Sequence, residues 1–151
     1  MKSSVSDCLR AIPGPCCVRW PDGERFKRAF AHGTMSVELY APLGNDPQQP
    51  HAQDELYFIH SGTGIFRVDG DSQAFAPGDC FFVAAGVTHR FEAFSEDFCA
   101  WVVFWGPLGG ESPWSFRLRF GYSGTVHSRL CNARFLTDLP CRPHGCSHEK
   151  T

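Results

Sequence analysis

The sequence contains no long hydrophobic run. None of its 151 residues belongs to a stretch near the roughly 18 apolar residues that a membrane helix needs. The first ten residues, MKSSVSDCLR, also lack the apolar core of a secretory signal. Charged residues are few, at 20%, beside 42% hydrophobic residues, which excludes a chain too polar to fold. We therefore expect one folded, cytoplasmic domain with no membrane partner.

The lack of an export signal also bears on the eight cysteines. In a secreted domain they would suggest a disulfide framework, whereas the reducing cytosol keeps most cysteines as thiols. Cys80 and Cys99 both lie inside apolar runs. We predict that these two are small buried hydrophobic residues and not ligands or redox centres.

A strong positive charge is also missing from most of the chain. Residues 1–112 carry 8 Lys and Arg against 14 Asp and Glu, a net charge of −6, while residues 113–151 carry 6 against 2, a net charge of +4. An acidic body of this kind is not typical of a nucleic-acid-binding protein. We predict no nucleic-acid partner.

No segment of residues 26–106 shows the sustained 3.6-residue apolar stripe of a helix. Short segments rich in Val, Phe, Tyr, Trp and Thr alternate instead with Gly-, Pro- and Asp-rich turns, as in antiparallel β-structure. The segments are FKRAFA, TMSVELYA, ELYFIH, TGIFRV, SQAF, CFFVA, VTHRFEAF and DFCAWVVFW. This pattern predicts an all-β barrel or sandwich over residues 26–110, an irregular lead-in over 1–25 and a tail over 111–151.

The polar residues that stand out lie in PQQPHAQDELYFI. Side chains of a strand alternate between its two faces. If this segment is extended, every second residue, beginning with Gln49, therefore lies on one face, and four of these residues are polar. A carboxylate at the mouth of an apolar interior needs a cation. The set comprises Gln49, His51, Gln53 and Glu55, with Tyr57 next on the same face.

A further histidine lies in GDCFFVAAGVTHRFEA, where turns surround a hydrophobic strand. This residue, His89, shares a strand face with Val87 and Phe91. A lone histidine there would more often be a core residue. Together with His51 and Glu55, however, it completes the two-histidine, one-carboxylate set that binds Fe(II) or a similar ion and leaves positions open for substrate or oxygen.

The spacing of these residues resembles that of the small single-domain microbial cupins, whose fold is a jelly-roll barrel, or double-stranded β-helix. Fifteen residues separate two motifs that follow the family's order, although the second lacks the family's Pro and Asn. The first motif matches at Gly44, Gln49, His51, Glu55 and Gly62, and the second at Gly78, Ala84, Gly86, His89 and Ala93.

The resemblance implies a metal site in which Gln49 takes the place of the family's first histidine. Gln53 has the same strand parity, so either glutamine could supply a fourth ligand through its amide oxygen. An oxygen donor favours Fe(II) or Mn over Zn or Ni, and weakens binding overall. A cupin that has lost its metal and kept a polar cluster is the alternative.

Two functions follow from the resemblance. The first is a mononuclear divalent-metal enzyme, dioxygenase-like or an isomerase, that acts on a small organic molecule, with Tyr57 next to the ligands as a supporting hydroxyl. The second is a cupin that binds a metal or small ligand without turnover, since the fold alone does not specify the chemistry. A homodimer is possible through TMSVELYA or through SFRLRFGY in the tail.

Overall fold

The computed structural model describes residues 1–112, so expectations about the tail, SFRLRFGY included, lie outside the described residues. All eight predicted strands are confirmed, and one short helix precedes them. The elements are α1 (Val5–Leu9), β1 (Phe26–His32), β2 (Met35–Tyr40), β3 (Asp54–Ser61), β4 (Gly64–Val68), β5 (Asp71–Phe75), β6 (Cys80–Val83), β7 (His89–Glu92) and β8 (Cys99–Trp105). Within this part of the chain no helix is long and apolar enough to cross a membrane.

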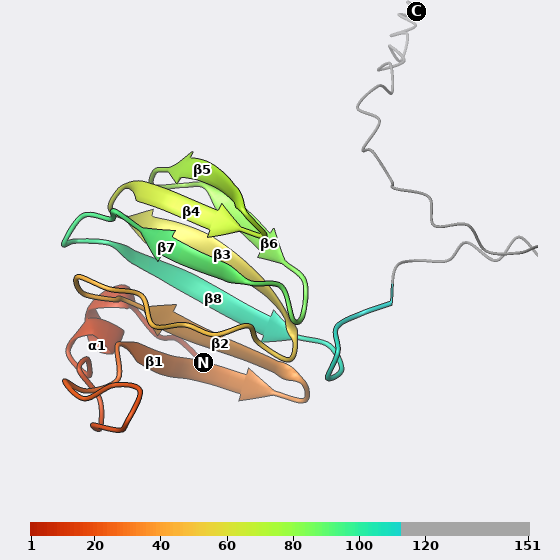
Figure 1. The fold of residues 1–151 in the computed structure, drawn as a ribbon. Helices are drawn as coiled ribbons and strands as arrows, with labels where there is room; N and C mark the ends of the chain where they lie inside the picture. The colour runs from red at the N-terminus through yellow and green to blue at the C-terminus, as the bar shows by residue number, and fades with distance from the viewer. Residues whose placement is uncertain (113–151) are drawn as a thin grey trace, which may run out of the picture. The chain divides into compact units, whose positions relative to one another are not determined.

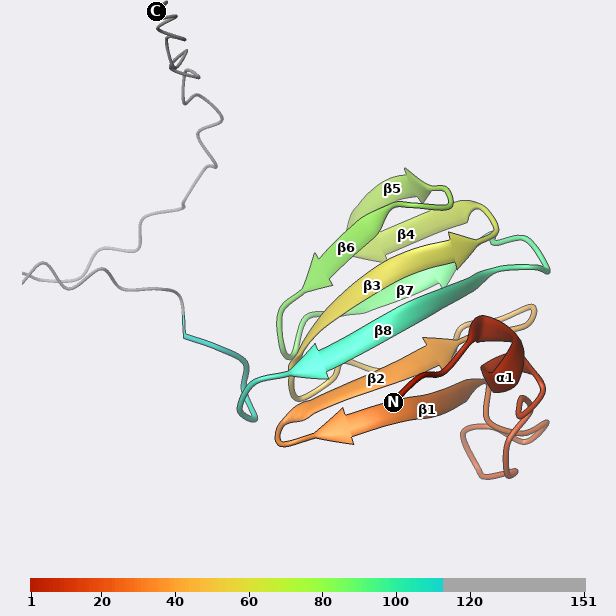
Figure 2. The same ribbon diagram turned by 180° about the vertical axis from the view of Figure 1, so that it is seen from behind.

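The strands form two antiparallel sheets. The larger has the order β1-β2-β8-β3-β6 and the smaller the order β5-β4-β7. The smaller sheet lies against β3 and β6, whereas β1 and β2 extend beyond it (Figures 1 and 2). This all-β arrangement fits a jelly roll, but no strand pairing among residues 1–112 closes the two sheets into one barrel.

Strand alternation determines which side chains face the space between the sheets. On β3, Glu55, Tyr57 and Ile59 are buried, while Phe58 points outward and is 44% exposed. Tyr57 pairs with Val102 of β8 in the sheet register. The inner face of β8 is therefore the one that carries Val102, which the sequence alone could not decide because a one-residue slip inverts every assignment.

The space between the sheets is filled with aromatic rings. Phe66 and Phe91 lie 4.4 Å apart between ring centroids, and Phe91 and Phe98 lie 4.6 Å apart. Such clusters bury large apolar areas and hold the two sheets together. The buried residues of this core are Tyr40, Tyr57, Ile59, Phe66, Phe75, Val83, Phe91, Phe98, Ala100 and Val102.

A smaller cluster lies on the outer face of the larger sheet, where α1 packs. Its buried members include Cys8 of the helix and Cys99 of β8. Cys99 is therefore buried as predicted. The prediction for Cys80 is wrong: it lies on the outer face of the edge strand β6 and is exposed.

The position of β2 bears on one of the two predicted dimer seams. β2 is paired with β1 on one side and with β8 on the other. Both of its edges are therefore occupied, and the segment TMSVELYA has no free edge with which to pair a second copy of the chain.

Candidate metal centre

His51 lies in the irregular segment between β2 and β3, and its place is fixed by backbone hydrogen bonds. Its carbonyl oxygen accepts from the Gly86 N–H at 2.8 Å, and the next carbonyl, that of Ala52, accepts from the Gly109 N–H at 2.7 Å. The imidazole contacts the Phe104 ring edge-on, with ring centroids 4.9 Å apart. The side chain is 30% exposed, so one side of the ring faces open space.

Glu55 is the second residue of β3, and its side chain is 1% exposed. In the sheet register it lies between Val83 of β6 and Phe104 of β8. Within residues 1–112 its only ion-pair partners are His51 and His89, with no Lys or Arg nearby. A buried carboxylate without such a partner requires another source of positive charge.

His89 opens β7 and is buried, at 2% exposed. Its Nδ1 lies 2.9 Å from the carbonyl oxygen of Val87. A carbonyl only accepts, so the hydrogen of the neutral ring is at Nδ1 and the lone pair is at Nε2. A histidine held in this tautomer by a backbone carbonyl is in the form that coordinates a metal.

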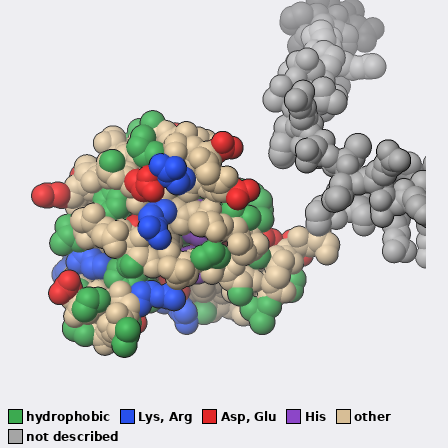
Figure 3. Space-filling view, in the orientation of Figure 1, with side chains coloured by type: hydrophobic (Ala, Val, Ile, Leu, Met, Phe, Trp, Pro, Cys, Tyr) green, Lys and Arg blue, Asp and Glu red, His purple; other side chains and the backbone are tan. Residues whose placement is uncertain are grey.

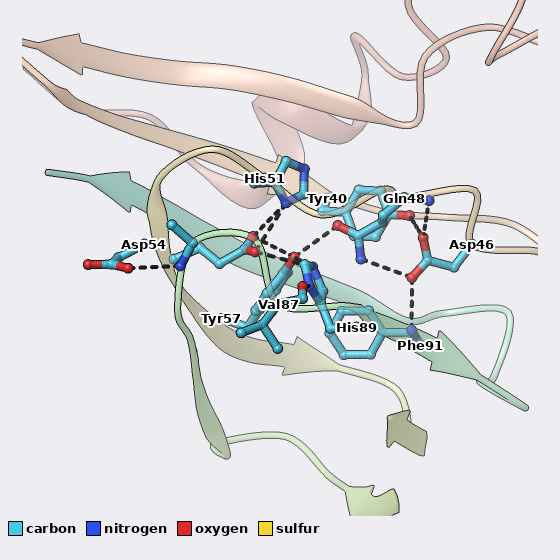
Figure 4. Close-up of polar contacts among 11 residues, drawn as sticks. Tyr40, Asp46, Gln48, His51, Asp54, Tyr57, Val87, His89 and Phe91 are labelled. Carbon is cyan, nitrogen blue, oxygen red and sulfur yellow. Dashed lines mark hydrogen bonds and ion pairs between the residues drawn. The ribbon is translucent and has the colours of Figure 1, made fainter. Parts of the chain in front are cut away.

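One nitrogen or oxygen atom from each of the three side chains approaches the same point, and Figure 4 shows the two histidines of this set. His51 Nδ1 lies 3.1 Å from Glu55 Oε1, and His89 Nε2 lies 3.2 Å from the same oxygen. One possible ligand atom from each residue lies within 4.8 Å of the others. The donor set therefore fits a single divalent ion, with two imidazole nitrogens and one carboxylate.

Tyr57 lies beside this cluster, and its hydroxyl oxygen contacts three acceptor atoms. These are Gln48 Oε1 at 2.9 Å, Glu55 Oε2 at 2.8 Å and His89 Nε2 at 3.0 Å. Burial first, and then the Glu55 carboxylate, raise the pKa of Tyr57 well above its usual value. The hydroxyl therefore keeps its one hydrogen at neutral pH, and that hydrogen can serve only one of the three acceptors.

The cluster consequently has fewer hydrogens than acceptor atoms. A metal ion would satisfy the remaining lone pairs. Every buried side-chain N and O atom within residues 1–112 has a contact at hydrogen-bond distance, but the three contacts of the Tyr57 hydroxyl share its single hydrogen. The site residues thus fit a metal on chemical grounds as well as on geometry.

The two glutamines that the sequence pointed to do not join this cluster. Gln49 is exposed. Gln53 donates through Nε2 to the carbonyl oxygens of Thr34 at 2.9 Å and Gly106 at 2.8 Å, which ties its amide to the turn after β1 and to the end of β8. Their roles as ligands stay predictions that no contact in the described residues supports.

Gln48, which the sequence analysis did not single out, is the glutamine that reaches the site. It is buried, and besides contacting Tyr57 it donates through Nε2 to Asp46 Oδ2 at 2.9 Å. The strand-parity argument missed it because the chain forms no strand between Tyr40 and Asp54. The signal available in the sequence was the pair Pro47 and Pro50, which disfavours regular strand pairing around Gln48.

Asp46 holds Gln48 in place and joins the loop to the smaller sheet. It is 1% exposed and accepts from the Tyr40 hydroxyl at 2.5 Å and from the Phe91 N–H at 2.8 Å. The Gln48 N–H also donates to it, at 3.0 Å. A continuous hydrogen-bond chain thus runs from Tyr40 through Asp46, Gln48 and Tyr57 to the candidate ligands (Figure 4).

A cavity of about 320 Å³ opens beside His51. It lies over β1, β2 and β8, on the part of the larger sheet that extends beyond the smaller one. A space of this size is within the range of small-molecule sites. Its lining residues are Arg19, Trp20, Phe26, Arg28, Ser36, Glu38, Tyr40, Gln48, His51, Ala52, Gln53, Val102 and Phe104.

Comparison with known proteins identifies the class. The family model of the cupin domain matches residues 36–105, which span β2 to β8. An uncharacterized protein of Streptomyces coelicolor is 47% identical over 75 residues, which cover 48% of this chain and 71% of that protein. The chain therefore belongs to the cupin family.

One solved structure has the same fold, and others are similar to it in part. The crystal structure of a Neisseria meningitidis protein superposes with a TM-score of 0.52 at 20% identity, covering 70% of this chain and 100% of the other. A cupin 2 conserved barrel domain protein from Salinispora arenicola matches with a TM-score of 0.47 at 18% identity, over 54% of this chain and 74% of that one.

Proposed function

We propose that this cupin holds one divalent metal ion through His51, Glu55 and His89 and acts as a dioxygenase-like enzyme on a small organic molecule. The observation that carries the proposal is the buried Glu55 carboxylate, which has two imidazoles and no Lys or Arg within reach in residues 1–112. The cavity beside His51 supports access by a small molecule from one side.

The donor set favours Fe(II) or Mn, with Zn or Ni as weaker alternatives. Such an ion supplies Lewis acidity and a template for substrate and oxygen. The other residues of the site would orient the metal ligands. The Val87 carbonyl fixes the tautomer of His89, and the Tyr57 hydroxyl, which stays protonated, contacts both Glu55 and His89. Tyr57 would keep these two ligands oriented, as groups just outside a coordination sphere do.

The alternative is a cupin that binds a metal or a small ligand without turnover. The same three side chains and the same cavity would serve such a module equally well, because a fold and a bound ion do not by themselves specify turnover. An isomerase would require an acid or base that faces the cavity, and Glu38, the one carboxylate that lines it, is ion-paired with Arg28.

The test is metal analysis of protein purified without an affinity tag, followed by oxygen-consumption assays with thiols, phenols and keto acids. The enzyme proposal predicts about one Fe or Mn per chain and oxygen uptake with one of these classes. Bound metal without uptake for any class would favour the non-catalytic binder. Cytoplasmic location and a homodimer stay predictions from the sequence, and light scattering tests the second.

A further inference from the structure

We infer that the cavity beside His51 selects small organic anions with an apolar body, and that Arg19 of the lead-in is the residue that recognises the negative charge. This inference rests on the proposed function, since it names the substrate class of the same site. Nothing in the sequence pattern pointed to Arg19, because the sequence predicts only an irregular lead-in over residues 1–25.

The first step is that the lead-in forms a wall of the cavity. Trp20 packs on the core, with its ring 6.1 Å from that of Phe26 and 6.3 Å from that of Tyr40, both in edge-to-face geometry. Tyr40 donates a hydrogen bond to the buried Asp46. The contact between Trp20 and Tyr40 therefore connects the lead-in to the hydrogen-bond chain of the site. The wall is thus part of the packed structure.

The second step is that Arg19 has a fixed place in that wall. Cys17 and Trp20 exchange two backbone hydrogen bonds, each of 3.0 Å, which makes Val18 and Arg19 the central residues of a tight turn. The Gly23 N–H also donates to the Trp20 carbonyl at 3.0 Å. The backbone that carries the guanidinium is therefore held next to the cavity.

The third step concerns charge. Three residues with a full charge line the cavity: Arg19, Arg28 and Glu38. Arg28 donates to Glu38 at 3.1 Å, so these two neutralise each other, whereas Arg19 has no ion pair within residues 1–112. One net positive charge thus lines this cavity although residues 1–112 carry −6 overall. In the orientation of Figure 1, the space-filling view of Figure 3 shows histidine atoms at the surface, with Lys and Arg side chains nearby.

The fourth step concerns the rest of the wall. Trp20, Phe26, Val102 and Phe104 are apolar, and Phe104 contacts the His51 ring. An apolar wall with one guanidinium suits a ligand that has a hydrophobic body and a carboxylate or similar group, because Arg binds such groups with paired hydrogen bonds. The volume of about 320 Å³ limits the ligand to a small molecule.

The experiment compares benzoate with benzamide, which share a shape and differ in charge. Calorimetric titrations use the full chain loaded with Mn(II), in the wild type, Arg19→Gln, Arg19→Lys and Arg10→Gln. Arg10 is the matched control because it is an exposed arginine that pairs with Asp7 near α1 and does not line the cavity.

We expect the wild type to prefer benzoate and Arg19→Gln to bind benzoate about three- to tenfold more weakly, with benzamide binding unchanged. Arg19→Lys should keep part of the preference, and Arg10→Gln should match the wild type. The inference is overturned if the wild type binds neither compound, if it does not discriminate between them, or if Arg19→Gln retains the preference. Absence of Mn(II) binding in the wild type would instead count against the proposed function, and the same titrations on the metal-free chain would still test Arg19.

Discussion

At the scale of single residues, the Glu55 carboxylate governs the site. It is buried, and its neighbours are two histidines and a tyrosine that keeps its proton. The Tyr57 hydroxyl shares one hydrogen among three acceptor atoms, and His89 directs its ring hydrogen to the Val87 carbonyl. The local chemistry therefore favours a bound cation over a network of neutral groups.

Replacement of either histidine should remove the metal. We expect His51→Ala or His89→Ala to lose most of the bound ion, because each deletes one of the three ligand atoms that come together within residues 1–112. The controls Gln49→Ala and Gln53→Ala should lose far less, since Gln49 is exposed and Gln53 bonds elsewhere. Elemental analysis of purified protein measures the stoichiometry, and an unchanged value in both histidine variants would refute the assignment.

Glu55→Gln tests charge separately from shape. The amide has the same size but no negative charge to balance the ion, so metal affinity should fall by at least about tenfold while the fold is kept. Competition with a chelator gives the affinity, and circular dichroism checks the fold. Equal affinity in the variant and the wild type would make Glu55 a structural residue.

At the scale of elements, the segment between β2 and β3 connects the two sheets through one side chain. Asp46, from this segment, accepts from the Phe91 N–H of β7 in the smaller sheet and from the Tyr40 hydroxyl of β2 in the larger. Burial first, and then the Asp46 charge, raise the pKa of Tyr40, so its hydroxyl stays a donor to Asp46.

Asp46→Asn should therefore destabilise the protein by about 2 to 4 kcal/mol, because an amide cannot accept from all of the buried donors that surround it. Asp79→Asn is the control: within residues 1–112 this exposed side chain accepts from the Ala76 N–H alone, and its replacement should cost at most about 1 kcal/mol. Urea unfolding measures both. Equal losses of unfolding free energy in the two variants would show that the buried hydrogen bonds of Asp46 stabilise the protein no more than the exposed one of Asp79.

The faces of the strands predict which thiols react. Cys80 lies outward on the edge strand β6, whereas burial raises the pKa of the Cys99 thiol and so lowers its thiolate fraction. Iodoacetamide at pH 8 should modify Cys16, Cys17 and Cys80 well before Cys8 and Cys99. Peptide mass spectrometry at successive times follows the reaction, and early labelling of Cys99 would contradict the orientation of β8.

The elements were predictable from the sequence because short β-rich runs and turn residues alternate throughout residues 26–106. Which side chains share a face of an element was predictable only for residues that lie inside strands. Parity correctly grouped Glu55 with Tyr57 on β3, but it does not apply to Gln49 and Gln53, since the chain forms no strand from residue 41 to residue 53. Gln48 reaches the site through a loop whose path depends on Asp46, and such tertiary contacts are not encoded in local periodicity.

At the scale of the whole molecule, the two sheets differ in width, and this difference creates the cavity. Five strands face three, so β1 and β2 extend beyond the smaller sheet, and the lead-in with Trp20 packs there. The sequence predicted only an irregular lead-in over residues 1–25, whereas Trp20 of this segment packs against the core. The site therefore combines residues of the cupin core with residues that precede it.

The most direct test of the central claim is a crystal structure of the tag-free protein with anomalous diffraction data collected at the absorption edge of its bound metal. The account predicts one anomalous peak among His51 Nδ1, the Glu55 carboxylate and His89 Nε2, the atoms that already converge. A peak at any other position in the domain, or none in protein supplied with Fe(II) or Mn(II), would contradict it.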